Sequence, residues 1–256
     1  MPEKGYRTAL VTGASSGIGA AVALTLAEGG LLVHAVARRA DRLDALAAQG
    51  TILPHSLDLT DDAARDALFA TLEPDVVVLN AAVARAGALH ELDAADIDRQ
   101  LDLNVGSVLK SLRVLLPGLI ARNRGHIVLI GSVAGVYPLA QAATYAATKA
   151  AIHSAALTLR AELAATRIRV TEVIPGRVRT EIHAVALGDP EAARRRLLDG
   201  FETLEAQDVA DAVGYAIAAP ARVNVGVIEI SPTHQAYGGI VFVPSDAAAA
   251  GAGPPP

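Results

Sequence analysis

Residues 12–19 read Thr-Gly-Ala-Ser-Ser-Gly-Ile-Gly, directly after a short apolar run and directly before a helical pattern. Gly13 and Gly17 allow the backbone to turn tightly and to approach a diphosphate, and Gly19 allows the helix to pack close to a sheet. The start of the helix adds free N–H groups and a partial positive charge. An ordinary strand-to-helix turn is the alternative. The glycine spacing predicts a loop that binds the phosphates of a dinucleotide.

Short apolar runs alternate with alanine- and leucine-rich helical patterns on either side of this loop. We expect strands at residues 8–12, 31–36, 51–57, 75–80, 125–130, 168–174 and 225–230, and helices at 18–28, 40–48, 61–72, 94–120, 144–165 and 207–219. Several runs are apolar almost throughout, which is typical of strands buried on both faces. The pattern predicts an α/β fold of Rossmann type: a doubly wound, seven-stranded, mostly parallel sheet with helices on both faces.

Composition limits the domain count and the class of protein. The 256 residues include 22 Lys+Arg and 27 Asp+Glu, with 52% hydrophobic types and no cysteine. The apolar content excludes a disordered chain, and the charge balance argues against a nucleic-acid partner. Without cysteine there is no disulfide or thiolate zinc site, and the scattered histidines predict no metal site. We expect one domain at residues 1–244 and a disordered Ala/Gly/Pro-rich tail at 245–256.

The same sequence indicates where the protein resides. No uninterrupted apolar run approaches the roughly 20 residues that a bilayer span needs. The apolar stretch before Gly13 is too short for the core of a signal peptide. We therefore expect a cytoplasmic protein without a membrane partner.

The end of the second expected strand indicates which dinucleotide is bound. An NAD site places Asp or Glu there, whereas this chain has Ala37 followed by Arg38 and Arg39. An acid would repel a 2′-phosphate, and planar guanidinium groups can bind one bidentately. The alternative is that both arginines are solvated loop charges. We expect NADP(H) as the cofactor.

Tyr145 and Lys149 form a Y-x3-K pair within an expected helix. Four residues is about one turn, so both side chains lie on one face, about 6 Å apart along the axis. A tyrosine pKa near 10 must fall by about 3 units for proton exchange at neutral pH. A cation about 4 Å away supplies about 4 kcal/mol at an effective dielectric constant near 20. The chain has only three lysines, Lys4, Lys110 and Lys149, so a specific role for Lys149 is favoured over a stray helical pair.

Two polar residues lie where they could complete a catalytic site. Ser132 follows the fifth expected strand, at the edge of the sheet where ligands bind in doubly wound folds. Its hydroxyl could donate to a substrate carbonyl oxygen and stabilise developing negative charge, although a turn serine is the alternative. Asn104 lies inside an expected helix, where asparagine is unfavourable, and this favours a functional reason for it.

The G-x3-G-x-G spacing at residues 13–19, Ser132 and the Y-x3-K pair together resemble the short-chain dehydrogenase/reductase family. The resemblance runs from Ala9 to about Ile230. It implies that Ser132 polarises a carbonyl and that Tyr145 exchanges the proton. It also implies that Lys149 lowers the tyrosine pKa and holds the nicotinamide ribose, and that Asn104 holds a water of the proton relay.

The resemblance also implies a set of cofactor contacts. The adenine ring would meet Asp58, for which a role near a helix start ahead of Thr60 is the alternative. In the P-G-x-V-x-T segment at residues 175–180, the Val178 backbone and the Thr180 hydroxyl would hold the carboxamide. The full expected set is Gly13, Ser15, Ser16, Gly17, Ile18, Gly19, Arg38, Arg39, Asp58, Leu59, Asn80, Ala81, Tyr145, Lys149, Pro175, Gly176, Val178 and Thr180. The chain departs from the family at Leu79 and Ala82, in place of Asn and Gly, and at Ser16, where some NADP-using relatives have a basic residue.

These patterns predict an NADP(H)-dependent oxidoreductase that transfers a hydride between nicotinamide and a carbonyl or alcohol. Residues 223–233 resemble those of 3-hydroxy acid dehydrogenases and clavulanate-type aldehyde reductases, which suggests a small polar substrate. A lid is expected at residues 181–200, and Tyr137, Leu139 and His183 are candidate pocket residues. The alternatives are an NAD-linked alcohol dehydrogenase and a catalytically silent dinucleotide sensor. The resemblance also implies a homo-oligomer, a tetramer or a dimer.

Overall fold

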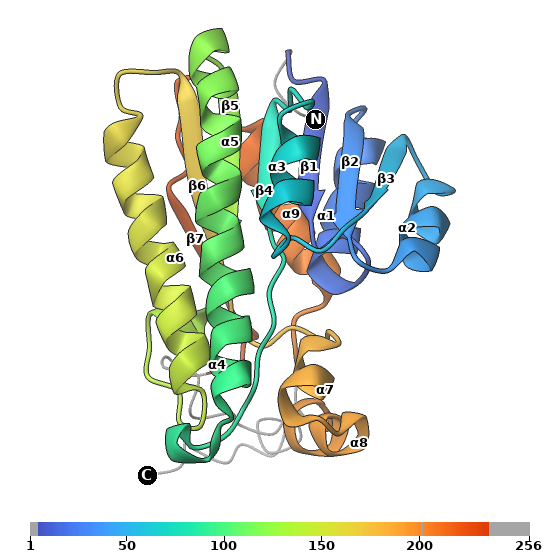
Figure 1. Cartoon of the computed structure of the whole chain (residues 1–256), viewed down its shortest axis with the longest axis vertical. Coiled ribbons are helices and arrows are strands. Elements are labelled where there is room, and N and C mark those ends of the chain that lie inside the picture. Colours follow the sequence, from blue (N-terminus) through green and yellow to red (C-terminus); the bar gives the residue numbers. More distant parts are fainter. Residues whose placement is uncertain (1–4, 201, 236–256) are drawn as a thin grey trace.

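The sheet has seven strands in the computed structural model, which describes residues 5–200 and 202–235. The strands are β1 (Thr8–Thr12), β2 (Leu32–Ala37), β3 (Ile52–Ser56), β4 (Val76–Leu79), β5 (Gly125–Ile130), β6 (Ile168–Pro175) and β7 (Val227–Ile230). They pair in the order β3-β2-β1-β4-β5-β6-β7, and each neighbouring pair is parallel (Figure 1). The predicted seven-stranded, doubly wound α/β fold is confirmed. The strand order reverses direction between β1 and β4, which is where such folds bind ligands.

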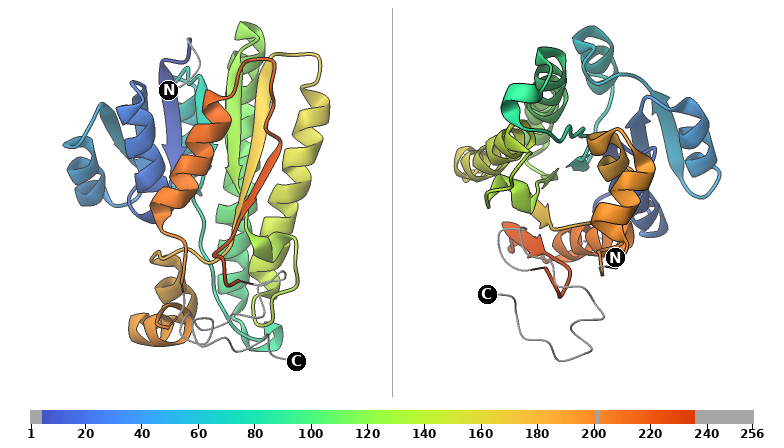
Figure 2. Two further views of the ribbon diagram at one scale, coloured as in Figure 1. Left: turned by 180° about the vertical axis from the view of Figure 1, so that it is seen from behind. Right: turned by 90° about the horizontal axis from the view of Figure 1, so that it is seen from below.

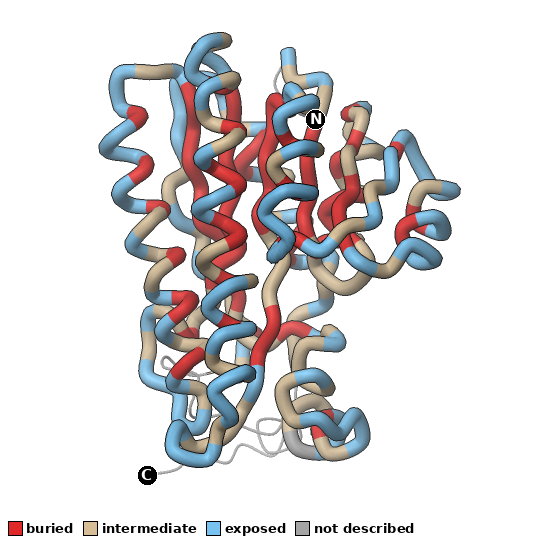
Figure 3. Tube along the Cα trace, in the orientation of Figure 1, coloured by how far each residue is buried: buried red, intermediate tan, exposed pale blue. Residues whose placement is uncertain are grey.

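Helices cover both faces of the sheet (Figures 1 and 2). One face packs against α1 (Gly17–Glu28), α2 (Ala40–Ala47) and α9 (Ala206–Ala218). The other packs against α3 (Asp62–Phe69), α5 (Ser107–Arg122) and α6 (Ala143–Glu162). Figure 3 shows the central strands as the most buried part of the chain. This double burial explains why β4 and β5 read as continuous apolar runs.

The expected helix at 94–120 is divided in the structure. It comprises α4 (Ala94–Leu101), the π-helical segment η2 (Asp102–Gly106) and then α5. Asn104 lies in η2 and its side chain binds the backbone of Val83, a contact that a regular helical pattern does not reveal. Wider turns of this kind are frequent at functional sites.

The last strand begins two residues later than the expected strand at 225–230. The side-chain amide of Asn224 accepts from the N–H of Val170 at 2.8 Å and donates to its carbonyl at 3.0 Å. A side chain makes these bonds with β6, and the backbone bonding to β6 begins with the Gly226 carbonyl, which accepts from the Glu172 N–H, so that the paired register starts at Val227.

Short helical segments connect the main elements. The connections are η1 (Leu89–Glu91) and η3 (Val133–Gly135), and the expected lid at 181–200 contains α7 (Ile182–Leu187), α8 (Pro190–Ala193) and η4 (Arg194–Leu198). The lid lies beyond the lower end of the sheet in Figure 1. The expected tail at 245–256 lies outside the described residues.

One helical stretch, Ala94–Arg122, is long and apolar enough to cross a membrane by length and composition alone, with a mean hydropathy of 1.3. Its buried residues Leu112, Leu115 and Leu119 pack in the core against the sheet. This is weak evidence for a span, because a core helix has the same composition. Within residues 5–200 and 202–235, no group of three or more His, Asp or Glu could hold a metal ion.

Candidate active site

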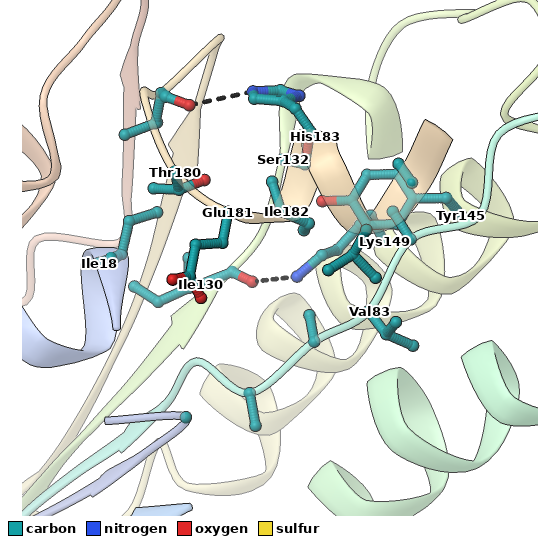
Figure 4. Close-up of a pocket in the computed structure, with 18 of the residues that line it drawn as sticks. Ile18, Val83, Ile130, Ser132, Tyr145, Lys149, Thr180, Glu181, Ile182 and His183 are labelled. Atoms are coloured by element: carbon teal, nitrogen blue, oxygen red, sulfur yellow. Dashed lines mark hydrogen bonds between the residues drawn. The ribbon is translucent and has the colours of Figure 1, made fainter. Parts of the chain in front are cut away.

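A cavity of about 720 Å³ lies where the carboxyl ends of the central strands meet the lid. It brings together the glycine loop, the residues after β2 to β6, the first turns of α6, and the lid (Figure 4). Of the expected site residues, those lining it are Gly13, Ser15, Ser16, Gly17, Ile18, Arg38, Arg39, Asp58, Leu59, Asn80, Ala81, Ser132, Tyr145, Lys149, Pro175, Gly176, Val178 and Thr180. Gly19 and Asn104 lie behind the lining.

The glycine loop needs glycine for two separate reasons. Gly13 and Gly17 have φ of 68° and 53°, in the left-handed region that other residues rarely adopt. A Cβ at Gly13 would also lie 2.8 Å from the Cα of Ala81. Gly19 packs against the Gly13 carbonyl, where a Cβ would overlap it. Gly19 therefore brings the helix close to the glycine loop without lining the cavity itself.

The two arginines after β2 have different surroundings. The Arg39 guanidinium donates to the hydroxyls of Ser15, at 3.0 and 3.1 Å, and Ser16, at 2.7 Å. It also binds Glu181 of the lid at 2.8 Å. Arg38 is 60% exposed and lies 3.8 Å from Asp58. Arg39 is thus fixed on the phosphate side of the cavity, whereas Arg38 extends from its rim.

Glu181 is a residue whose role the sequence did not indicate. Its carboxylate binds Arg39 and also Arg42, at 2.6 Å, across 139 to 142 residues of chain. Hydrogen bonds from these two guanidinium groups lower the pKa of Glu181 to about 2. The lid is therefore ion-paired to the arginines beside the glycine loop.

Asn80 and Asp58 also stabilise the loops that they belong to. The Asn80 side chain donates to the Thr12 carbonyl at 3.0 Å, and the Thr12 hydroxyl accepts from the N–H groups of Asn80 and Ala81. Asp58 accepts from the Thr60 N–H at 2.9 Å, and this bond is the main cause that lowers the pKa of Asp58. Asp58 thus makes the local contact given above as its alternative role and also lines the cavity.

Ser132, Tyr145 and Lys149 meet on one side of the cavity (Figure 4). Ser132 follows β5 and caps η3, and its hydroxyl acts on the Tyr145 phenol, whose pKa it lowers. Lys149 is buried, and its Nζ lies 5.9 Å from the centre of the Tyr145 ring. The expected one-turn spacing on α6 therefore places both groups at the same site.

The electrostatics of Tyr145 differ from the expectation. Burial raises the pKa of the phenol, and the Ser132 hydroxyl only partly opposes this. The Lys149 Nζ donates to the Ile130 carbonyl at 2.7 Å, and burial lowers its own pKa to about 8. In the protein alone, desolvation outweighs the cation that we expected to dominate.

Asn104 uses its side chain differently from the expected water contact. Its amide oxygen accepts from the Val83 N–H at 2.8 Å, and its amide nitrogen donates to the Val83 carbonyl at 2.8 Å and to the Thr148 hydroxyl at 3.1 Å. Thr148 precedes Lys149 on α6. The Asn104 side chain therefore joins the segment after β4 to the helix that carries Tyr145 and Lys149.

Polar groups from the segment after β6 face the same cavity. Arg177 is half-buried and binds the Leu197 carbonyl of the lid at 3.0 Å, and burial lowers its pKa to about 10. His183 contacts the Val178 carbonyl at 3.0 Å, and burial lowers its pKa. A neutral ring there donates from Nε2 and presents Nδ1 as an acceptor. Arg177 was overlooked, although it lies within the quoted P-G-x-V-x-T segment.

The expected pocket residues are only partly placed in the cavity. Leu139 and His183 line it. The Tyr137 hydroxyl instead donates to Glu229 on β7 at 3.3 Å. The side chain of Tyr137 therefore points toward the last strand.

The observed loop and its surroundings fit a dinucleotide with a 2′-phosphate. The positive-φ glycines bring backbone to the cavity, the start of α1 faces it, and the Ser15, Ser16 and Arg39 groups form a polar cluster beside it. A cavity of about 720 Å³ has the size of a cofactor and small-ligand site.

Known proteins support this assignment. Residues 7–189 match the model of the short chain dehydrogenase family. The chain is 41% identical to the uncharacterized short-chain type dehydrogenase/reductase y4eK of Sinorhizobium fredii, over 93% of this chain and 96% of that protein. It is 36% identical to the NADP-dependent 3-hydroxy acid dehydrogenase YdfG of Salmonella typhi, over 90% and 97%. The closed form of serine dehydrogenase complexed with NADP+ superimposes with a TM-score of 0.87 at 32% identity, over 92% and 99%.

The matches extend over nearly the whole length of the relatives, so they concern the entire catalytic domain. The NADP-dependent relatives and the NADP+ complex support the NADP(H) cofactor that was predicted from the arginines after β2. They do not support the alternative of an NAD-linked enzyme. The chain belongs to the short-chain dehydrogenase/reductase family and is an NADP(H)-dependent oxidoreductase.

Proposed function

We propose that this enzyme transfers a hydride between NADP(H) and a small hydroxy acid or oxo acid, with Tyr145 as general acid and base. The observation that carries the proposal is the grouping of Ser132, Tyr145 and Lys149, the last one helical turn from Tyr145, in one cavity with the glycine loop. NADPH, when bound, supplies the hydride.

The residues around the reacting carbonyl have complementary roles. Ser132 donates a hydrogen bond to the carbonyl oxygen and stabilises the negative charge that develops there. Tyr145 then gives its proton to that oxygen. The raised pKa of Tyr145 keeps the phenol protonated at neutral pH, which is the form that reduction requires.

Lys149 and Asn104 support this proton transfer. Lys149 is held by the Ile130 carbonyl beside the tyrosine, where its charge favours the phenolate that remains after transfer. Asn104 ties α6 to the segment after β4, so we assign it the positioning of the Tyr145 helix. We place the contact with a relay water on the backbone of η2, since the Asn104 amide is already bonded.

The cofactor contacts follow the lining of the cavity. Gly13, Ser15, Ser16, Gly17 and Ile18 would hold the phosphates, with Gly19 bringing the helix close. The adenosine half would contact Arg38, Arg39, Asp58, Leu59, Asn80 and Ala81, and the nicotinamide half Tyr145, Lys149, Pro175, Gly176, Val178 and Thr180. Arg39 is the main 2′-phosphate ligand in this assignment, because its guanidinium is already oriented by Ser15 and Ser16.

The acid group of the substrate is inferred from the lid side of the cavity. Arg177 adds a positive charge, and that charge contributes to the lowered pKa of His183. Two relatives act, by their names, on a 3-hydroxy acid and on serine, and both compounds carry a carboxylate beside an alcohol. We assign the substrate carboxylate to Arg177 and the alcohol or carbonyl oxygen to Ser132 and Tyr145.

The test compares a panel of short 3-hydroxy acids with their methyl esters, using NADP+ and steady-state kinetics. We expect kcat/KM for the acids to fall by about 10- to 100-fold in Arg177→Gln, because a charge-assisted hydrogen bond contributes about 1.5–3 kcal/mol. The esters should be unaffected. Arg179→Gln is the matched control, since Arg179 pairs with Glu205 and does not line the cavity. An equal loss for acids and esters would contradict the assignment of Arg177.

We also propose a cytoplasmic homo-oligomer, a tetramer or a dimer. Exposed apolar residues lie on the two long helices, with Leu109 and Ile120 on α5 and Leu157 on α6. A second copy packed on these helices would cover them. The molar mass in solution, measured by light scattering, tests this proposal.

A further inference from the structure

Glu172 is a buried carboxylate in a strand that is buried along its whole length. It lies on β6 and is 1% exposed, and its strand neighbours Val170, Val173 and Ile174 are buried as well. Removing an ionised carboxylate from water costs several kcal/mol unless it is paired and hydrogen bonded. A group of this kind beside an active site is a candidate for a functional role.

His153 is the direct partner of this carboxylate. Its Nδ1 lies 2.7 Å from Oε2 of Glu172, and the imidazole is 33% exposed. His153 follows Lys149 on α6 by four residues, as Lys149 follows Tyr145. The three side chains therefore succeed one another along the helix, from the cavity toward solvent.

The other carboxylate oxygen of Glu172 lies against Gly131, the residue before Ser132. A Cβ at Gly131 would overlap Oε1 of Glu172, so only glycine leaves room for the carboxylate there. Gly131 precedes Ser132 and follows Ile130, whose carbonyl accepts from Lys149. Glu172 thus lies under the segment that positions both the serine and the lysine.

The charges of this group act on one another. Burial lowers the pKa of Lys149 to about 8, and the charge of Glu172 raises it in opposition. Burial raises the pKa of Glu172, while His153 and Lys149 lower it. Each charge therefore helps the other to persist in a site that disfavours both.

We propose that Glu172 and His153 are positioning residues for the reaction: the buried carboxylate, held by the imidazole, keeps the Lys149 ammonium charged beside Tyr145. The inference rests on the role of Lys149 in the proposed function. His153 donates to Glu172 and so keeps it ionised, and Glu172 supplies the negative charge that Lys149 needs within the protein.

The remaining charged or titratable groups near this face are separately engaged. Arg160, further along α6, lies against Gly226 before β7. Glu229 on β7 accepts from the Tyr137 hydroxyl. From η2, the Asn104 amide is neutral, and β5 contributes the apolar Ile127 and Leu129 to the core under α6. His126 on β5 is bonded to the Thr171 hydroxyl, and burial lowers its pKa. Arg169 on β6 donates to the carbonyls at the end of α9. Of the described acids, Asp75 is also buried, but it binds the backbone of Arg7 and Thr8 at the amino end of the sheet.

A purely structural tie between α6 and β6 is the competing explanation. It predicts that loss of the pair lowers stability without changing the charge state of Lys149. A measurement of that charge state therefore separates the two explanations.

The experiment uses lysine labelled with 13C at Cε and follows its chemical shift with pH in the complete protein. The chain has only Lys4, Lys110 and Lys149, and Lys149→Arg assigns the third signal. In Glu172→Gln we expect the titration midpoint of Lys149 to fall by about 1 pH unit, because an opposite charge nearby favours the charged form. Lys110, which is paired with Asp62 at 2.7 Å, should not move and serves as the internal reference.

Further variants make the outcome decisive. The titration midpoint of Lys149 should fall less in His153→Leu than in Glu172→Gln. In His153→Gln it should return toward the wild-type value, because glutamine supplies a hydrogen-bond donor. The double variant Glu172→Gln/His153→Leu should have the same midpoint as Glu172→Gln alone. Glu172→Asp keeps the negative charge and replaces Glu172→Gln in the titration if that variant does not fold. Thr171→Val is the matched control, because it removes hydrogen bonds with His126 and Val225 from the neighbouring position of β6.

The proposal is overturned if Glu172→Gln leaves the Lys149 midpoint within about 0.2 pH units of the wild type. It is also overturned if Thr171→Val moves the midpoint equally. The titration needs no substrate, so it can succeed while the acid panel fails. In that case the proposed substrate is wrong, and the inference about Lys149 stands. In active enzyme, the alkaline limb of kcat for reduction should move to lower pH with the midpoint.

Discussion

The two sides of the cavity are stabilised in different ways. One side, here called the catalytic wall, comprises residues 130–135, η2 and α6. Its key side chains Asn104, Thr148 and Lys149 are buried and bonded to backbone or to one another. The other side is the lid at 181–200, built of helical segments of four to six residues. Its ion pairs, Arg39–Glu181 and Arg42–Glu181, join side chains that are 41–47% exposed.

This difference separates two requirements of the enzyme. Proton transfer needs groups held within tenths of an ångström, and buried hydrogen bonds to backbone provide that precision. Substrate entry needs a segment that opens at low cost, and exposed ion pairs contribute only about 0–1 kcal/mol each. In the proposed mechanism, the chemistry therefore lies on the catalytic wall and the access on the lid.

The largest expected effect tests the wall. Tyr145→Phe removes the acid and should lower kcat by about 10³-fold or more, since positioned acid–base groups contribute about 10²–10⁴-fold. NADPH binding, measured by fluorescence titration, should change little because the ring remains. Tyr215→Phe, on the exposed face of α9, is the control. Residual activity above a few per cent would show that another group supplies the proton.

An intermediate effect compares a glycine of the wall with one of the lid. In Gly135→Ala the new Cβ would lie 2.6 Å from the carbonyl carbon of Lys149, so η3 or α6 must shift. We expect the free energy of unfolding to fall by about 1–3 kcal/mol and kcat to fall about 10-fold or more. Gly200→Ala has a φ of 76° but nothing within 4 Å, so it should lose about 1 kcal/mol or more of stability with kcat unchanged.

Urea unfolding and steady-state kinetics measure both glycine variants. A similar loss of kcat in the two would remove the distinction between wall and lid.

The smallest effect tests the lid. In Glu181→Gln both ion pairs weaken, and we expect KM for substrate and Kd for NADPH to change less than about fivefold. Because the pKa of Glu181 is about 2, the wild-type carboxylate stays ionised from pH 8 down to pH 5. The contribution of its ion pairs is lost only as the pH falls toward 2. The ratio of the KM values of wild type and Glu181→Gln should therefore be constant between pH 5 and 8. High salt should reduce the difference. A change of more than tenfold in KM or Kd would mean that the ion pairs hold the lid more firmly than the exposure of their side chains indicates.

Much of the site could be read from the sequence because local spacing decides it. The glycine loop, the Ser132 turn and the Y-x3-K pair each lie within one short segment, where backbone geometry alone brings the groups together. The strands were predicted from continuous apolar runs, and their ends were placed within two residues. The break in the helix at 94–120 was not predicted, because it depends on a contact between Asn104 and Val83 from another part of the chain.

The amino-acid sequence by itself determined the parallel sheet, the phosphate-binding loop and the one-turn spacing of phenol and ammonium, because period and spacing act over a few residues. Only the tertiary structure decided which charges meet. It paired Glu181 with Arg39 across 142 residues and Glu172 with His153 across 19, and its burial raised the pKa of Tyr145 where a nearby cation alone would lower it. The reason is physical: desolvation and ion pairing depend on what surrounds a group in space, and the linear order of residues does not specify that surrounding.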